Sequence, residues 1–145
     1  MKNKSFATLG TLALLAAASA FGQQKVQADI PFEFSIQNTN MPAGHYDVTW
    51  TRGVLRVHND TSRGDVTTIT SNIGGASGEN AEVRLVFNKY GDKYFLAEVW
   101  PSSDATYGVG LGKSRTEREI AGVTPQVARI AIPLRTGVAA LAALR

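Results

Sequence analysis

Two histidines and two aspartates lie at a spacing that could bring them into one small cluster. His45 and Asp47 alternate along one segment, and His58 and Asp60 alternate along the next. If the segments pair as an antiparallel hairpin, His58 lies opposite Asp47 and His45 opposite Asp60, with Cβ atoms about 4.5–5.5 Å apart. Imidazole and carboxylate groups at that distance form ion pairs or hold a divalent metal weakly. The commoner interpretation is a solvated strand face, where such pairs contribute little to stability.

Four aromatic residues form a second candidate site, in this case for a ligand. They are Trp50, Tyr94, Trp100 and Tyr107. Tryptophan and tyrosine combine a broad apolar ring with a polar atom, so they stack on sugars and line apolar pockets. We therefore consider a sugar-stacking platform or the mouth of a barrel as possible uses of these side chains.

The sequence contains no recognisable catalytic motif. It has no cysteine, which excludes thiol catalysis and thiolate metal sites, and it has two histidines. The H-E-x-x-H and G-x-S-x-G motifs are absent, and no P-loop lysine follows the glycines of residues 74–78. We therefore expect a non-enzymatic protein with no catalytic residue and no cofactor.

The first 22 residues have the organisation of a cleaved export signal. Two lysines precede an apolar run over residues 6–18, and the small residues Ala18-Ser19-Ala20 follow in an A-x-A arrangement. Cleavage is expected after Ala20 or after Gly22. An uncleaved anchor is the alternative, but the apolar run is shorter than the roughly 20 residues that span a bilayer. We expect an exported bacterial protein, in the periplasm or outside the cell, without stable membrane insertion after cleavage.

The charge of the mature chain is nearly balanced. Of the 15 Lys and Arg residues two lie in the export signal, whereas none of the 12 Asp and Glu residues does, which leaves a net charge of about +1. This balance gives no reason to expect a nucleic-acid partner. Without cysteine there is no disulfide, so a hydrophobic core must hold the fold. Residues 23–145 are long enough for one such domain.

Hydrophobic periodicity predicts a β-rich domain. Apolar side chains occupy every second position from Val26 to Ile36, as expected of a strand with one buried face. Pro31 cannot donate a hydrogen bond to a neighbouring strand, so this strand should lie at an edge or contain a bulge. A weaker strand is expected at residues 65–70.

Residues 45–50 and 54–59 are expected to pair as a hairpin with Arg52-Gly53 at its tip. This register sets Trp50 opposite Leu55 and places the apolar side chains on one face. A shift by one residue would mix polar and apolar side chains on both faces, which favours the first register.

A second hairpin is expected within residues 81–100. A type I turn over residues 88–91, with Gly91 at positive φ, pairs Leu85 with Phe95 and gives a uniformly apolar face. A two-residue turn at Gly91-Asp92 would mix polar and apolar residues, so we favour the type I turn. Periodicity of this strength is more typical of core packing than of a binding patch.

The C-terminal third is expected to contain one short helix. Ser114 and Glu117 have the spacing of a capping box, and Gly122 is a candidate helix stop. The tail, residues 123–145, could contain a last strand at 127–132, and its final residues favour helix but are too few to form one alone. Residues 71–80 and 101–112 are interpreted as loops. The predicted fold is a mainly all-β, single antiparallel β-sandwich or small barrel of six to seven strands, with one short helix near the C-terminus.

Several segments together resemble a family of small exported proteins of unassigned function that is common in acidobacterial genomes. They are IPFEFSI, MPAGHYDV, LVFNKYGDKYFLAEVW and SRTEREIA, and the resemblance covers about residues 30–121. Its most specific marks are Y-G-D-x-Y-F-L, which starts at Tyr90, and S-x-x-E-R, which starts at Ser114. The tail from Val123 departs from this pattern. The resemblance implies an exported β-rich protein and assigns no functional residue.

Two kinds of function fit these observations best. The first is a non-enzymatic exported protein with a structural or interaction role, which presents loops or an open strand edge to a protein partner or to a second copy. The second is a binding module for a small apolar or carbohydrate ligand. A cavity between the sheets would favour the binding module, whereas a filled core with an exposed apolar edge would favour the interaction protein.

Overall fold

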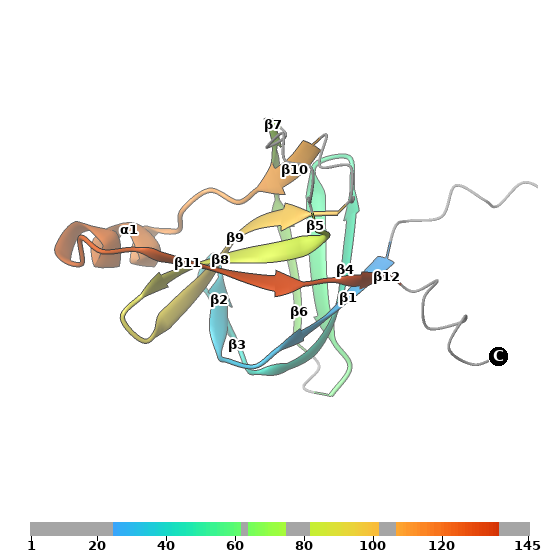
Figure 1. Ribbon diagram of the computed structural model, residues 1–145, viewed down its shortest axis with the longest axis horizontal. Helices are drawn as coiled ribbons and strands as arrows, with labels where there is room; N and C mark the ends of the chain where they lie inside the picture. The colour runs from blue at the N-terminus through green and yellow to red at the C-terminus, as the bar shows by residue number, and fades with distance from the viewer. Residues whose placement is uncertain (1–24, 62–63, 75–81, 102–106, 137–145) are drawn as a thin grey trace, which may run out of the picture.

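The computed structural model describes residues 25–61, 64–74, 82–101 and 107–136, and in this part of the chain the strands form two sheets and no closed barrel (Figure 1). The five-stranded sheet has the order β12 (Arg135–Thr136), β1 (Lys25–Ile30), β4 (Gly44–Thr51), β5 (Val54–Asn59) and β6 (Gly64–Ile69). The seven-stranded sheet has the order β11 (Ala128–Pro133), β8 (Arg84–Tyr90), β9 (Lys93–Trp100), β10 (Tyr107–Gly110) and β7 (Ser71–Gly74), and it also includes β2 (Phe34–Ile36) and β3 (Thr39–Met41). The expectation of a mainly β fold with one short helix is confirmed.

At two corners the chain passes from one sheet to the other with a single residue between the strands. Thr70 separates β6 from β7, and its N–H donates to the carbonyl of Gly53 at 2.8 Å. Leu134 separates β11 from β12, and its N–H donates to the carbonyl of Val83 at 2.8 Å. Each corner divides one run of extended chain between two sheets. The corners thereby add β7 and β12 to the six or seven strands that were predicted.

The core lies between the two sheets and draws on both. Phe34 packs edge-to-face against Tyr46, with ring centroids 5.2 Å apart, and against Phe87 at 5.3 Å. The alternate apolar residues of β1 and β4 lie in this core, as their period of two predicts. The most deeply buried large side chains are Tyr46, Phe34, Phe87, Ile30, Ile36, Met41, Leu55, Leu85, Val48, Val57 and Val99.

The single strand predicted from Val26 to Ile36 is wrong, because the chain breaks at Pro31. The first strand, β1, ends at Ile30, and the next, β2, begins at Phe34 in the other sheet. Proline cannot take part in a ladder as a donor. The break therefore coincides with the point where the chain leaves the five-stranded sheet.

The β4–β5 hairpin has the predicted register. Trp50 pairs with Leu55 and Val48 pairs with Val57. Arg52 and Gly53 form the tip, and both have positive φ, 49° and 82°. This is the pattern of a type I′ turn, whose twist matches that of the flanking strands.

The register predicted for the β8–β9 hairpin is wrong, although Gly91 has the predicted positive φ of 63°. Tyr90 pairs with Lys93 around a two-residue turn, and Leu85 pairs with Val99. The register shifts between Val86 and Phe87, where Ala97 is the extra residue of a bulge. Because of the bulge, Leu85 and Val99 both face the core. A ladder without the bulge would pair Leu85 with Glu98 instead.

Two segments interpreted as loops contain strands. Residues 71–74 form β7 and residues 107–110 form β10, and the two pair antiparallel. Both are short and contain glycine, which hides the period of two. The expected strands at residues 65–70 and 127–132 are present as β6 and β11. The export signal and residues 137–145 lie outside the described residues.

The helix α1 (Arg115–Val123) begins as predicted and ends later. The Ser114 Oγ accepts a hydrogen bond from the Glu117 N–H at 3.1 Å, as an N-cap does. Gly122 is not the stop. It lies inside the helix without positive φ, and Thr124 caps the end by donating its N–H to the Ile120 carbonyl. No helix in the described ranges has the length and apolar character needed to cross a membrane.

Candidate functional site

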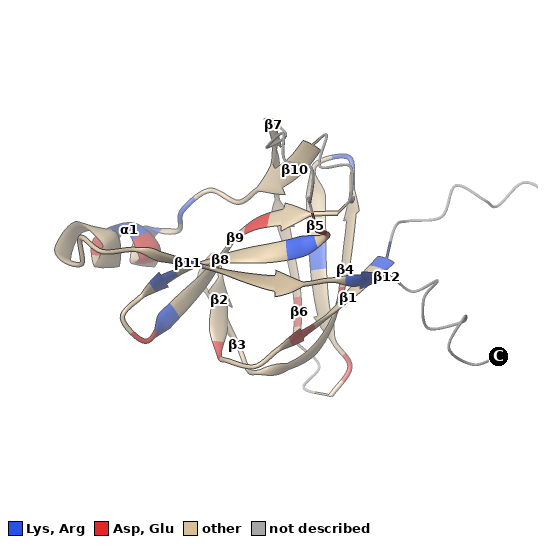
Figure 2. Ribbon diagram, in the orientation of Figure 1, with Lys and Arg blue, Asp and Glu red and all other residues tan. Residues whose placement is uncertain are grey.

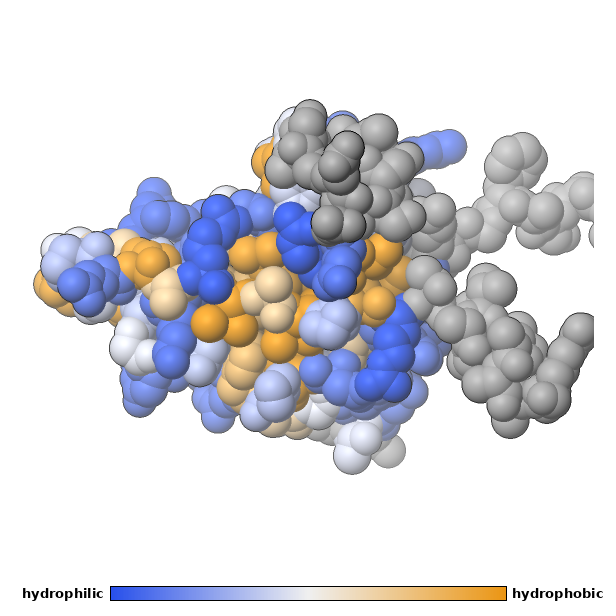
Figure 3. Space-filling model, in the orientation of Figure 1, coloured by the Kyte–Doolittle hydropathy of each residue, from blue (hydrophilic) through white to orange (hydrophobic). Residues whose placement is uncertain are grey.

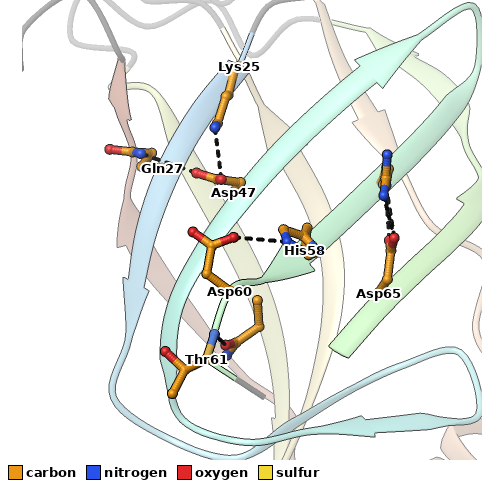
Figure 4. A network of polar contacts seen from close by, with 9 residues as sticks. Lys25, Gln27, Asp47, His58, Asp60, Thr61 and Asp65 are labelled. Carbon is orange, nitrogen blue, oxygen red and sulfur yellow. Dashed lines mark hydrogen bonds and ion pairs between the residues drawn. The ribbon is translucent and has the colours of Figure 1, made fainter. Parts of the chain in front are cut away.

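Three of the four predicted histidine and aspartate residues, His45, Asp47 and His58, lie on the outer face of the five-stranded sheet, and Asp60 lies in the turn after β5. Asp47 lies opposite His58 in the β4–β5 ladder, as expected, but each side chain has a different partner (Figure 4). The His58 Nε2 lies 2.9 Å from an Asp60 carboxylate oxygen. Asp47 accepts a hydrogen bond from Gln27 at 3.1 Å and pairs with the Lys25 ammonium at 2.8 Å.

The prediction that His45 lies opposite Asp60 is wrong. The β4–β5 ladder ends at Asp47 and His58, and His45 pairs across β1 with Asp29, where the two side chains approach to 2.7 Å. Arg135 of β12 also pairs with Asp29. Within the described ranges, no three His, Cys, Asp or Glu side chains are grouped so that they could hold a metal ion.

Neighbouring side chains lower the pKa of two carboxyl groups on this face, those of Asp29 and Asp47. The hydrogen bond with His45 is the main cause of the lowered pKa of Asp29. Burial would raise the pKa of Asp47, but hydrogen bonds from Lys25 and Gln27 outweigh it, and the net effect is a lowered pKa. The polar residues of this face therefore form a set of surface ion pairs.

The four aromatic candidates do not form one site. Trp50 and Tyr107 come together, and they line a hollow of about 480 Å³ at the Thr70 corner. We call it the corner hollow. Its other lining side chains include Arg52, Thr70 and Asn72. It lies where the tip of the β4–β5 hairpin meets β7 and β10 of the other sheet.

Trp100 lies elsewhere, on the outer face of the seven-stranded sheet. It is 5% exposed, packs with Val86 and Ile73, and lines an open groove of about 540 Å³. We call this the outer groove. Its lining residues are Ile73, Val86, Trp100 and Ala131 together with the charged Arg84, Glu98 and Arg129. Figure 3 shows apolar surface bordered by hydrophilic side chains on the face that it views, over β8 and β11.

Charged side chains fix the position of Trp100. Its Nε1 donates to a Glu98 carboxylate oxygen at 2.8 Å, and the Arg84 guanidinium lies 5.2 Å from its ring centroid. Arg129 of β11 pairs with the other oxygen of Glu98. Figure 2 shows basic segments on β8 and β11 and an acidic one on β9. The sequence alone does not identify Arg84 and Arg129 as site residues, because their proximity depends on the pairing of β11 with β8.

Tyr94 is used in packing. Its ring stacks on Phe32 with centroids 3.8 Å apart, and Lys89 lies over it at 5.3 Å. The residue therefore ties the β8–β9 hairpin to the segment between β1 and β2. Because the Tyr94 ring already stacks on Phe32 and lies near the Lys89 ammonium group, it is a poor candidate for ligand stacking.

The helix is attached to the seven-stranded sheet through a buried acid. Glu117 is 4% exposed and accepts hydrogen bonds from the Asn88 Nδ2 at 3.0 Å and the Tyr90 hydroxyl at 3.1 Å. Burial, reinforced by the nearby carboxylate, raises the pKa of Tyr90. The sequence pattern assigned Glu117 to a capping box, whereas its carboxylate bonds to the β8 side chains.

The fold and these sites define a two-sheet β protein with a polar ion-paired face, a corner hollow and an outer groove. No protein-family model, no curated protein sequence and no solved structure matches this chain.

Proposed function

We propose that this chain is an exported, non-enzymatic interaction protein that binds an extended segment of a protein partner in its outer groove. The observation that carries the proposal is the groove itself, an open apolar surface with charged side chains on the outside of the seven-stranded sheet. Concave surfaces with an apolar floor and a few charged side chains are typical of binding sites. Export, and kinship with the acidobacterial family, belong to the same proposal and rest on the sequence patterns described above.

The chemistry of the groove indicates the chemistry of the partner. Val86 and Trp100 are each 5% exposed and form an apolar floor. Two arginines and one glutamate line the same surface, so its net charge is positive. A complementary segment would place apolar side chains on the floor and a carboxylate near Arg84 or Arg129. Extended peptides suit such a surface because alternate side chains point the same way.

The groove is already formed without a partner. Trp100 is held by Glu98 and Arg84 and lies across the backbone of Gly108, where an added Cβ would come within 2.8 Å of its ring. A fixed binding surface avoids the ordering cost that weakens flexible ones.

A selection with displayed peptides tests this proposal. Random peptides of about eight residues, selected on the immobilised protein, should become enriched in sequences that alternate apolar residues and contain Asp or Glu. Their affinity should fall at high salt, because the arginine contacts are partly exposed to solvent.

Two exposed alanines of β11 provide a matched pair of variants. Ala131 lines the outer groove, whereas Ala128 does not. Ala131→Asp should weaken the selected peptides at least tenfold, and Ala128→Asp should leave their affinity unchanged. If no sequence class is enriched, or if the peptides bind both variants equally well, the proposed function is wrong.

A further inference from the structure

The corner hollow brings together two aromatic rings that are open to a ligand. Trp50 is partly buried against the core, and Tyr107 is 44% exposed. Among the described residues, neither ring stacks on another aromatic side chain or lies under a cation. The apolar faces of sugar rings pack on aromatic side chains of this kind. The volume of about 480 Å³ lies in the usual range of small-ligand sites.

The polar side chains of the hollow have unused hydrogen-bonding capacity. In the part of the chain that the structure describes, the side chains of Arg52 and Asn72 make no hydrogen bond or ion pair. Thr70 is 9% exposed, and its hydroxyl also has no partner there. By contrast, the basic side chains on the outer face of the same sheet are paired, as Arg56 is with Asp65. Arg52 and Asn72 are exposed, so their side chains can exchange water for a ligand without breaking an internal contact. Thr70 adds a buried hydroxyl with no partner in the described residues, which is uncommon because buried polar groups are normally hydrogen-bonded.

Arg52 occupies a backbone conformation that its residue type disfavours. Its φ is 49°, at the first central position of a hairpin turn where asparagine, aspartate or glycine is usual. Left-handed conformations are costly for other residues, and they concentrate at binding and catalytic sites. Among the described residues that line the hollow, Arg52 carries the only charge. The arginine at this position fits the recognition of a carboxylate, which guanidinium groups bind through paired hydrogen bonds.

We infer that the corner hollow binds a saccharide that contains a sugar acid. A sugar ring packs against Tyr107 and Trp50, its carboxylate pairs with the Arg52 guanidinium, and its hydroxyl groups bond with Asn72 and, after rotation of its side chain, with Thr70. The hollow lies at the corner between β6 and β7, and the outer groove crosses from β11 to β7 on the other face. This inference is therefore independent of the proposed partner site.

Calorimetric titration of the purified protein tests the inference. The probes are the acidic trisaccharides of galacturonic and mannuronic acid and the neutral trisaccharides of galactose and mannose. At least one acidic trisaccharide should bind, about tenfold or more tightly than its neutral counterpart. The preference should decrease as salt is added, because the Arg52 contact is electrostatic.

Variants of two exposed side chains separate binding from folding. Tyr107→Ala should remove binding of the acidic sugar. Arg52→Asn should weaken it at least tenfold while the melting temperature stays equal or rises, because asparagine tolerates positive φ better than arginine. Arg118→Gln, on the exposed surface of α1, is the matched control and should leave the affinity unchanged.

Three results would overturn the inference. The first is that no acidic trisaccharide binds, and the second is binding that survives Tyr107→Ala. The third is equal affinity for acidic and neutral trisaccharides, which would remove the role given to Arg52. None of these results bears on the outer groove, because peptides selected there should bind equally well to Arg52→Asn and to the unaltered protein.

Discussion

Trp100 shows how a single side chain can serve the fold and a surface site together. Its ring is buried against Val86 and Ile73, while its indole N–H and the arginine above it belong to the outer groove. The ring also requires glycine at position 108 in β10, because it packs directly on the backbone there and leaves no room for a side chain. Residue type alone could nominate Trp100 for a site, but it could not reveal this contact between separate strands.

Gly108→Ala should destabilise the protein by about 1–3 kcal/mol, since overpacking of a tight contact displaces the larger side chain. The added Cβ would lie 2.8 Å from the Trp100 ring. Gly74→Ala is the control on the adjacent strand, because nothing lies within 4 Å of its added Cβ. Urea unfolding monitored by tryptophan fluorescence gives both values. Equal stabilities for the two variants would contradict the described packing of Trp100.

The candidate site residues could be predicted only where local pattern decides their position. The period of two placed Trp50 and the histidines on opposite faces of the β4–β5 hairpin. Trp50 and Tyr107 are more than 50 residues apart in the sequence. They line one hollow because the chain turns at Thr70 from β6 into β7, and β7 pairs with β10. The ion pair between His45 and Asp29 likewise depends on β1 lying beside β4. Sequence periodicity carries no information about such long-range neighbours.

At the level of elements, register was predictable for one hairpin and not for the other. In β4 and β5 one face is apolar and the other polar, so a single register satisfies both. In β8 and β9 both faces contain buried residues, because one faces the core and the other is partly covered by Trp100 and α1. When both faces of a strand pair are apolar, the sequence pattern does not select one register. The observed register depends on the bulge at Ala97, and no residue type in the sequence predicts that bulge.

Gly91→Val should destabilise the protein by about 1 kcal/mol or more, because a β-branched residue is strained at positive φ. Gly91 has φ 63° as the first residue of the two-residue turn, where a type II′ turn requires glycine. Asp92 follows it without positive φ and is exposed, so Asp92→Ala should have a small effect. Thermal unfolding of the two variants measures the difference. An unchanged melting temperature for Gly91→Val would rule out this turn.

For the whole molecule, the two corners determine where binding can occur. Because β6 continues into β7 and β11 into β12, the sheets enclose a core packed with Phe34, Tyr46 and Phe87. Ligands are therefore expected at the outside of the sheets and at the corners, as in the outer groove and the corner hollow. The mainly β class followed from periodicity, whereas the two corners and the path between the sheets required the three-dimensional structure.

The most direct test of the proposed partner site is a two-dimensional ¹⁵N NMR titration of the protein with an acidic peptide from the display selection. The Trp100 indole N–H is a sensitive reporter, because it donates a hydrogen bond to Glu98 within the outer groove. We predict peptide-dependent shifts for this signal and for the backbone amides of Arg84, Arg129 and Ala131. Shifts confined to the five-stranded sheet, with the Trp100 indole signal unchanged, would contradict the proposal that the outer groove is the interaction surface.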